Sequence, residues 1–241
     1  VVGTLRSKSR EEEVKNGIEK VVRSTNLSFI ETHLMTDDGW EEGMTGCKYV
    51  MHVAMPFIIA EPKDPDDIIL PTVEGTKRVL RFAKEAGVKR VVLTSTTLNV
   101  GHHNYSGSYD QNSWTDHKSN NISTYVRAKV LQELAAWEFI NSQEGKPKLE
   151  LTVLLLGGVF GPALTASGVS RDLIKQLIEG KQPMVPDLHI PMVDFRESAI
   201  AHLKAMETKL ANGKRLIIGN PDIGIESFAS ICRVLRQNGF N

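Results

Sequence analysis

The chain has 241 residues, 41% of them hydrophobic, and its 29 basic side chains balance 29 acidic ones, which gives a formal net charge of zero. This length and apolar content suit one large domain, or one domain with a small lobe, and the balanced charge gives no electrostatic reason to expect a nucleic-acid partner. No apolar run reaches the roughly 20 residues that a membrane span needs, and the N-terminus lacks the basic-then-apolar layout of a signal peptide, so we expect a cytoplasmic protein with no membrane partner.

The first 162 residues alternate short apolar runs with stretches of helical spacing. Apolar runs predict strands, and apolar residues repeated every three or four positions predict helices. In chain order we expect strands at Val1–Leu5, Leu27–Glu31, Tyr49–Val53, Arg90–Thr94 and Leu151–Leu156, and helices at Glu11–Val22, Ile68–Ala86 and Thr124–Asn141. The run at Leu151–Leu156 is apolar throughout, which is typical of a strand covered on both faces. This alternation predicts βαβ units in a parallel sheet.

The pattern is less regular beyond Pro162 and predicts a smaller lobe. We expect helices at Arg171–Gly180, at Glu197–Glu207 and from Ile225, strands at Met192–Asp194 and Arg215–Gly219, and a proline-containing connection at Pro183–Pro191. Two connections stand out. Gly157–Pro162 is glycine-rich without GxGxxG spacing and is interpreted as a turn that leaves a strand. Gly101–Asn121 is long and polar, which is typical of a functional or disordered loop.

A tyrosine and a lysine lie four residues apart on the predicted helix at Thr124–Asn141. Tyr125 and Lys129 therefore share one face of this helix, which Ser123 is placed to cap. An ammonium group beside a phenol favours the phenolate, so we expect the pKa of Tyr125 to lie below its reference value of about 10. Such a phenol can act as a general acid toward a carbonyl oxygen. Taken alone, the pair also fits an ordinary amphipathic helix whose Tyr and Lys face water.

Two further groups of polar residues follow predicted strands. The hydroxyls of Thr94–Thr97 end an apolar strand, where an open parallel sheet binds its ligands, and one of them can donate to a substrate oxygen. Hydroxyl residues are also common at strand ends for structural reasons. Arg6 and Lys8 follow the first strand and could hold the 2′-phosphate that distinguishes NADP from NAD, or could belong to a solvated charge cluster.

The remaining polar residues predict no metal site. Cys47 and Cys232 are far apart and lack metal-ligand spacing, so we expect two thiols in a reducing compartment. His102 and His103 are adjacent, do not share a helix face, and have no carboxylates at metal-ligand spacing.

In serial order, these segments resemble the dihydroflavonol-reductase-like branch of the extended short-chain dehydrogenase/reductases, within the NAD-dependent epimerase/dehydratase superfamily. The resemblance covers almost the whole chain, and its serial order is more specific than any one motif. The segments that carry it are Val1–Ser7, Gly46–Phe57, Pro71–Thr76, Val91–Thr97, Trp114–Asp116, Tyr125–Lys129, Gly158–Pro162 and Val193–Arg196. Among these, Tyr125 and Lys129 match the YxxxK pair of the family, and Thr96 falls on its catalytic hydroxyl.

The resemblance implies a Rossmann-type doubly wound α/β fold, with a dinucleotide-binding domain at residues 1–162 and a substrate lobe at 163–241 that returns elements to the main sheet. It implies an NADP(H)-dependent oxidoreductase that interconverts a small carbonyl compound and its alcohol. In that reaction Tyr125 exchanges the proton, Lys129 lowers the tyrosine pKa, and Thr96 orients the carbonyl. The residues it implies for cofactor binding are Arg6, Lys8, Val53, Ala54, Pro56, Tyr125, Lys129, Gly158 and Val159. A homodimer through the long active-site helix is a further expectation.

The chain departs from the family pattern in three places. The family begins with a strand, a GxxGxxG loop and a helix, and nothing of this kind precedes Val1, so we expect a fragment whose parallel sheet lacks its first strand and whose hold on the pyrophosphate is weak. His33 stands where the family places an acidic residue near the adenine. Leu155 and Leu156 replace an Asn-Pro pair beside the nicotinamide.

Two alternatives remain at this point. A sterol dehydrogenase or a nucleotide-sugar epimerase shares the Tyr/Lys pair, although Arg6 argues against these NAD-using relatives. A non-catalytic remnant that binds a partner is of a different class, and the absent glycine loop is its main support.

Overall fold

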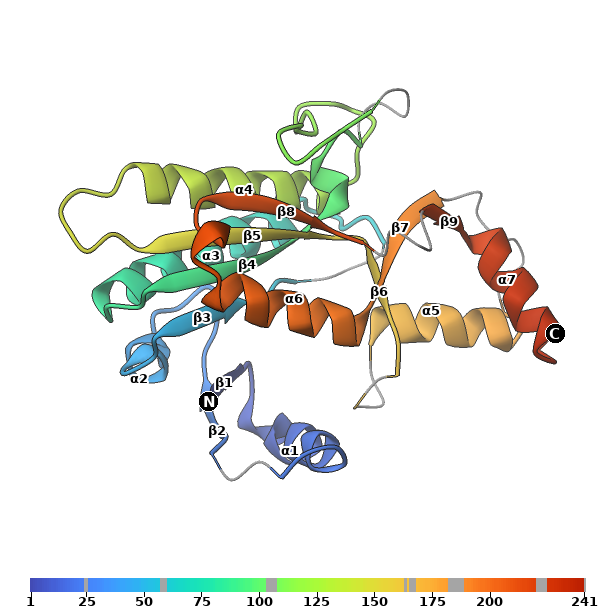
Figure 1. Ribbon diagram of the computed structural model, residues 1–241, viewed down its shortest axis with the longest axis horizontal. Helices are drawn as coiled ribbons and strands as arrows, with labels where there is room; N and C mark the ends of the chain where they lie inside the picture. Colours follow the sequence, from blue (N-terminus) through green and yellow to red (C-terminus); the bar gives the residue numbers. More distant parts are fainter. Residues whose placement is uncertain are drawn as a thin grey trace.

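Four parallel strands form the main sheet, in the order β3 (Tyr49–His52), β4 (Arg90–Thr96), β5 (Glu150–Leu156) and β8 (Lys214–Ile218) (Figure 1). The computed structural model describes residues 1–23, 26–56, 60–102, 108–162, 164, 168–181, 189–219 and 225–240. Phe57, His103 and most of Pro183–Pro191 lie outside these ranges. The parallel sheet predicted from the alternating pattern is confirmed.

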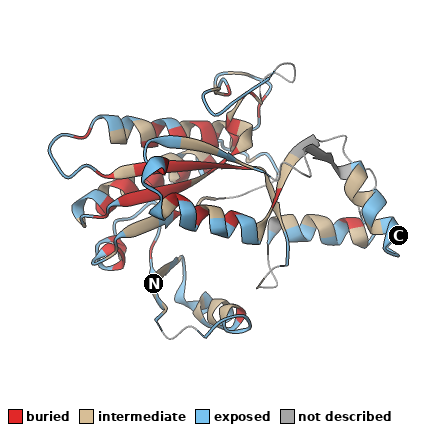
Figure 2. Ribbon diagram, in the orientation of Figure 1, coloured by how far each residue is buried: buried red, intermediate tan, exposed pale blue. Residues whose placement is uncertain are grey.

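The side chains of β4 and β5 alternate between two apolar layers, one on each face of the sheet. One layer contains α3 (Asp66–Glu85) and α4 (Thr124–Asn141), and the other contains α6 (Phe195–Glu207). The strand residues in the α3/α4 layer are Val91, Leu93, Leu151, Val153 and Leu155, and those in the α6 layer are Val92, Leu154 and Leu156. Both strands are buried along their length (Figure 2), as expected for strands covered on both faces.

The N-terminal strands form a second, two-stranded sheet. β1 (Val2–Leu5) pairs in parallel with β2 (Ser28–Glu31), and between them lie the 3-10 helix η1 (Lys8–Arg10) and α1 (Glu11–Glu19). A short helix, α2 (Trp40–Met44), follows β2 and contacts β1 and α3. Within the described ranges, no strand pairing links β1 or β2 to β3.

The C-terminal elements gather at one end of the main sheet, at the right of Figure 1. β6 (Gly158–Phe160) pairs in parallel with β7 (His189–Asp194), which pairs antiparallel with β9 (Ile225–Ser227). Two helices, α5 (Val169–Ile178) and α7 (Phe228–Gln237), accompany this sheet. β8 leaves the group and joins the main sheet beside β5.

Several sequence predictions need correction here. Gly158–Phe160 is a strand rather than part of a turn, because β7 supplies a parallel partner that lies far along the chain. The helix expected from Ile225 begins at Phe228, since Ile225–Ser227 pairs with β7. The short helix at Trp40–Met44 was not predicted, and β4 extends two residues beyond Thr94. In the described part of the chain, no helix combines the length and the apolar character that crossing a membrane requires.

Candidate active site

A pocket of about 330 Å³ lies at the carboxyl ends of β3, β4 and β5, beside the start of α4. Six of the residues predicted for catalysis or cofactor binding line it: Val53, Thr96, Tyr125, Lys129, Gly158 and Val159. The carboxyl ends of parallel strands are where open α/β sheets bind ligands. The structure therefore brings the predicted hydroxyl, phenol and ammonium groups together in one pocket.

The start of α4 places the tyrosine. The side-chain oxygen of Ser123 accepts a hydrogen bond from the backbone N–H of Val126 at 3.3 Å, which confirms the predicted cap. Tyr125 is the second residue of the helix, and its ring packs with Trp114 against the small apolar cluster of Ile122, Val126 and Val130. Capping and packing together fix the helical turn that carries the phenol.

Lys129 lies one turn further along α4 and is only 4% exposed. Its Nζ donates to the backbone oxygen of Thr94 at 3.0 Å and to Gln132 Oε1 at 3.1 Å. Burial lowers the pKa of Lys129 to about 8, and the negative charge of Glu133 opposes part of this shift. The Lys129 ammonium group thus donates hydrogen bonds to two neutral oxygens at the edge of the pocket.

The pKa of Tyr125 moves in the direction opposite to the prediction. Burial raises the pKa of Tyr125 to about 12, because the phenolate would lose its hydration in this pocket. The expectation that the pKa of Tyr125 lies below its ordinary value of 10 is therefore wrong. At neutral pH the phenol keeps its proton, which is the state that a proton donor needs.

The two hydroxyls at the end of β4 are used differently. Ser95 donates to Glu133 Oε2 at 3.1 Å, inside the protein. The side-chain oxygen of Thr96 accepts from the backbone N–H of Leu98 at 3.2 Å, so its own hydrogen is not used in that bond. This geometry supports the assignment of the reactive hydroxyl to Thr96 rather than to Ser95.

A buried ion pair behind the pocket was not predicted from the sequence. Arg215 of β8 pairs with Glu133 of α4, and the two side chains are 8% and 0% exposed. Glu133 also accepts from Asn99 Nδ2 at 2.7 Å, while Arg215 Nη1 donates to the backbone oxygens of Gln111 and Ser113 at 2.7 Å each. The Arg215 guanidinium stacks on the Trp114 ring, 3.7 Å from its centroid, so the pair ties the loop before α4 to the helix.

A second pocket, of about 430 Å³, lies at the ends of β1 and β2. It contains three of the predicted cofactor-binding residues, Arg6, Ala54 and Pro56, together with His33. Met55 lines both pockets, so they adjoin at this residue. Lys8 is not among the residues that line either one, and its backbone N–H donates to Glu31 at 2.8 Å.

Across the ranges that the structure describes, no group of three or more His, Cys, Asp or Glu residues could hold a metal ion. Leu156, which stands in the place of a family proline, lines the Tyr125 pocket, while Leu155 is fully buried in the core.

The pKa of Lys129 leads to a prediction about stability. The amine has an ordinary pKa of 10.5 and a folded-state pKa of about 8, so between these values the unfolded chain holds more protons and the stability of the native protein rises with pH. Relative to Lys129→Met, we expect the wild-type free energy of unfolding to increase by roughly 3 kcal/mol over this window. Urea unfolding at stepped pH measures the difference. Lys84 is exposed, so Lys84→Met should differ from the wild type by the same amount at every pH. Parallel curves for wild type and Lys129→Met would refute the shift.

Comparisons with known proteins identify the family of the chain. The family model described as "NAD dependent epimerase/dehydratase family" matches residues 2–219. A putative uncharacterized oxidoreductase of Saccharomyces cerevisiae is 31% identical over 76% of this chain and 59% of its own length, so the chain spans less than two thirds of that relative. A putative NADPH-dependent methylglyoxal reductase of Candida albicans is 27% identical over 97% of the chain and 74% of its own length. The crystal structure of yeast methylglyoxal/isovaleraldehyde reductase Gre2 with NADPH superposes with a TM-score of 0.85 at 25% identity, covering 99% of this chain and 75% of that one.

Proposed function

The chain belongs to the NAD dependent epimerase/dehydratase family, and we propose that it is an NADP(H)-dependent oxidoreductase that reduces a small aldehyde or ketone to an alcohol, or catalyses the reverse reaction. The observation that carries the proposal is that Thr96, Tyr125 and Lys129 line one pocket. The NADPH-dependent reductases among the matched proteins support it as well.

The residues of this pocket have complementary tasks. Bound NADPH would supply the hydride. Tyr125 holds its proton at neutral pH and donates it from Oη to the carbonyl oxygen, while the hydroxyl of Thr96 donates a hydrogen bond to the same oxygen. The Lys129 ammonium favours the negative charge left on the phenol oxygen. In alcohol oxidation the same groups take the reverse roles.

The residues present fit a dinucleotide at both of its ends. At the Arg6 pocket, Ala54 and Pro56 give an apolar wall for adenosine, and the exposed Arg6 guanidinium suits a 2′-phosphate. At the Tyr125 pocket, Lys129 would bind the ribose hydroxyls, and Val53, Gly158 and Val159 would border the nicotinamide. Met55 joins the two pockets, as one extended ligand requires.

We expect Arg6→Ala to reduce the preference for NADPH over NADH. Loss of a charge-assisted hydrogen bond costs about 1.5–3 kcal/mol, so the KM for NADPH should rise roughly 10- to 100-fold while the KM for NADH changes little. Steady-state kinetics with both cofactors measure this. Lys8→Ala is the matched control, because Lys8 lies outside the pocket and should have a smaller effect. Equal losses for the two cofactors would contradict the role of Arg6.

The proposed activity is tested by NADPH oxidation with a panel of 2-oxoaldehydes, branched aliphatic aldehydes and aromatic aldehydes. Turnover that saturates with one class supports a carbonyl reductase. Binding of NADPH without turnover on any class would favour the non-catalytic alternative. The reductases matched above favour carbonyl reduction over the sterol dehydrogenase and sugar epimerase alternatives. We also propose that residues 1–162 form the dinucleotide-binding domain and residues 163–241 the substrate lobe.

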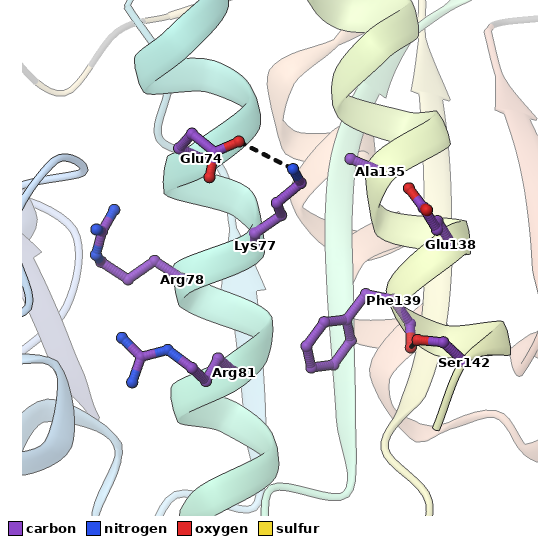
Figure 3. A pocket seen from close by; sticks show the side chains of 8 residues that line it. All are labelled: Glu74, Lys77, Arg78, Arg81, Ala135, Glu138, Phe139 and Ser142. Carbon is purple, nitrogen blue, oxygen red and sulfur yellow. Dashed lines mark hydrogen bonds and ion pairs between the residues drawn. The ribbon is translucent and has the colours of Figure 1, made fainter. Parts of the chain in front are cut away.

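The outer face of α3 and α4 is the proposed homodimer surface. Figure 3 shows the groove between the two helices, where Glu74 and Lys77 pair at 2.9 Å across from Glu138. Both charge signs on one face suit a two-fold contact, and the exposed Leu134 adds apolar area. Light scattering should give a dimer for the wild type, a monomer for Leu134→Asp, and a dimer for the control Leu210→Asp.

A cytoplasmic location is proposed on separate grounds. Cys47 and Cys232 are both free thiols in the structure, which is the usual state in a reducing compartment.

A further inference from the structure

A chain of hydrogen bonds runs from Lys129 into the protein interior. Lys129 Nζ donates to Gln132 Oε1 at 3.1 Å, Gln132 Nε2 donates to Thr76 Oγ1 at 2.8 Å, and Thr76 Oγ1 lies 2.8 Å from His52 Nε2. Each of these four side chains is 4% exposed or less. They come from α4, α3 and β3, and the last three line neither pocket. These hydrogen bonds therefore hold Lys129 from the interior of the protein.

The first two hydrogen bonds, from Lys129 to Gln132 and from Gln132 to Thr76, have a fixed direction. An ammonium group can only donate, so Gln132 must turn its amide oxygen toward Lys129 and its amide nitrogen toward α3. Thr76 accepts from that nitrogen and holds the amide in this orientation. His52 is neutral, because burial and then the charge of Lys129 lower its pKa to about 3. The chain thus ends without adding a second buried charge.

Charged and titratable groups surround Lys129 on three of the described elements. They are Tyr125 and Glu133 on α4, His52 on β3, and Arg215 on β8, which acts through Glu133. From β4 and α3 the described contacts are uncharged: the Thr94 backbone oxygen and the Thr76 hydroxyl. The Glu133 carboxylate also receives Arg215, Ser95 and Asn99. The direct acceptors of the ammonium are both neutral, and Gln132 is the described side chain that accepts a hydrogen bond from it.

We propose that Gln132 and Thr76 are positioning residues for Lys129, which hold its ammonium against the Thr94 carbonyl and set the pH range over which it stays charged. The assignment rests on the proposed function, in which Lys129 serves Tyr125 and the ribose. Because the Gln132 amide is neutral, Lys129 loses its proton at moderately alkaline pH. In the proposed reaction, kcat/KM should fall over the same pH range.

The test follows the titration of Lys129 directly, by NMR of protein labelled with ¹³Cε-lysine, with Lys129→Met to assign the signal. Gln132→Glu replaces a neutral acceptor with a carboxylate of the same shape. An opposite charge at this distance should raise the pKa of Lys129 by about one unit or more, and the alkaline limb of the kcat/KM profile should move with it. Gln132→Leu and Thr76→Val should move the titration downward, and Thr76→Ser should restore it.

Thr152→Val is the matched control. Thr152 is as buried as Thr76, and its hydroxyl donates to the backbone oxygen of Ala211 at 2.8 Å. This hydrogen bond is not part of the series that runs from Lys129 to His52. Thr152→Val should lower the free energy of unfolding but leave the Lys129 titration unchanged. If Gln132→Glu does not fold with a buried carboxyl group, the Thr76→Val and Thr76→Ser pair gives the same test.

The outcomes separate this inference from the proposed function. The variants could shift the Lys129 titration as expected while the wild type reduces no carbonyl compound. That result would support the positioning role of Gln132 and Thr76 and overturn only the proposed function. An active wild type whose Lys129 titration is the same in Gln132→Glu, Thr76→Val and Thr152→Val would overturn the positioning role alone.

Discussion

Tyr125→Phe should lower kcat for carbonyl reduction by roughly 100- to 10,000-fold, which is the usual contribution of a positioned general acid. The substitution removes only the phenol oxygen. The ring remains to pack with Trp114 against Ile122 and Val126, so the fold and the binding of NADPH should be retained. Steady-state rates on the best aldehyde of the panel, together with a fluorescence titration of NADPH, measure both effects.

Tyr49→Phe is the control for this variant. Tyr49 begins β3, at the end of the main sheet opposite the pocket, and should leave kcat unchanged. A Tyr125→Phe protein that keeps more than about a tenth of the wild-type rate would remove Tyr125 from the proton transfer, since a lost general acid costs at least about 100-fold. In that case the hydroxyl of Thr96 would be the next candidate donor.

Arg215→Met should destabilise the protein by about 3–5 kcal/mol, because it leaves the carboxylate of Glu133 buried without its counter-charge. Glu133 is fully buried in the structure. The substitution also removes the donors to the backbone oxygens of Gln111 and Ser113 and the cation that stacks on Trp114. Urea unfolding followed by circular dichroism measures the loss.

Two further variants show whether the buried charge is the cause. Combining Arg215→Met with Glu133→Leu removes both charges and should recover a large part of the lost stability. Arg81→Met breaks a more exposed pair with Asp37 and should cost less than about 1 kcal/mol. If Arg215→Met were no more harmful than Arg81→Met, the ion pair would not be a structural support of the loop.

The main sheet and the grouping of Thr96, Tyr125 and Lys129 in one pocket could be predicted because their signals are local. The apolar runs of β4 and β5 and the four-residue spacing of Tyr125 and Lys129 are visible within a few positions of the sequence. Gln132 and Glu133, three and four residues beyond Lys129, lie within the same reach, and helical spacing could have identified them as neighbours of the ammonium.

Other features had no local signal. Arg215 lies 82 residues from Glu133, and only the pairing of β8 with β5 brings the two together. β6 is three residues long and is defined by its distant partner β7. The pKa of Tyr125 was predicted in the wrong direction because spacing reports the neighbouring charge but not the burial that outweighs it. Lys8 was grouped with Arg6 by sequence proximity, although only Arg6 lines the pocket.

The alternation of side chains along β4 makes the length of this strand part of the chemistry. Val91, Leu93 and Ser95 lie on the α4 side, while Val92 and Thr94 meet α6, where Thr94 Oγ1 lies 2.8 Å from His202 Nε2. Inserting or deleting one residue before Ser95 would turn Ser95 toward α6 and Thr96 toward α4, so each of these two hydroxyls would lose its present partner. A single-residue insertion or deletion would therefore displace the proposed catalytic hydroxyl of Thr96 and disorganise both apolar layers in one step.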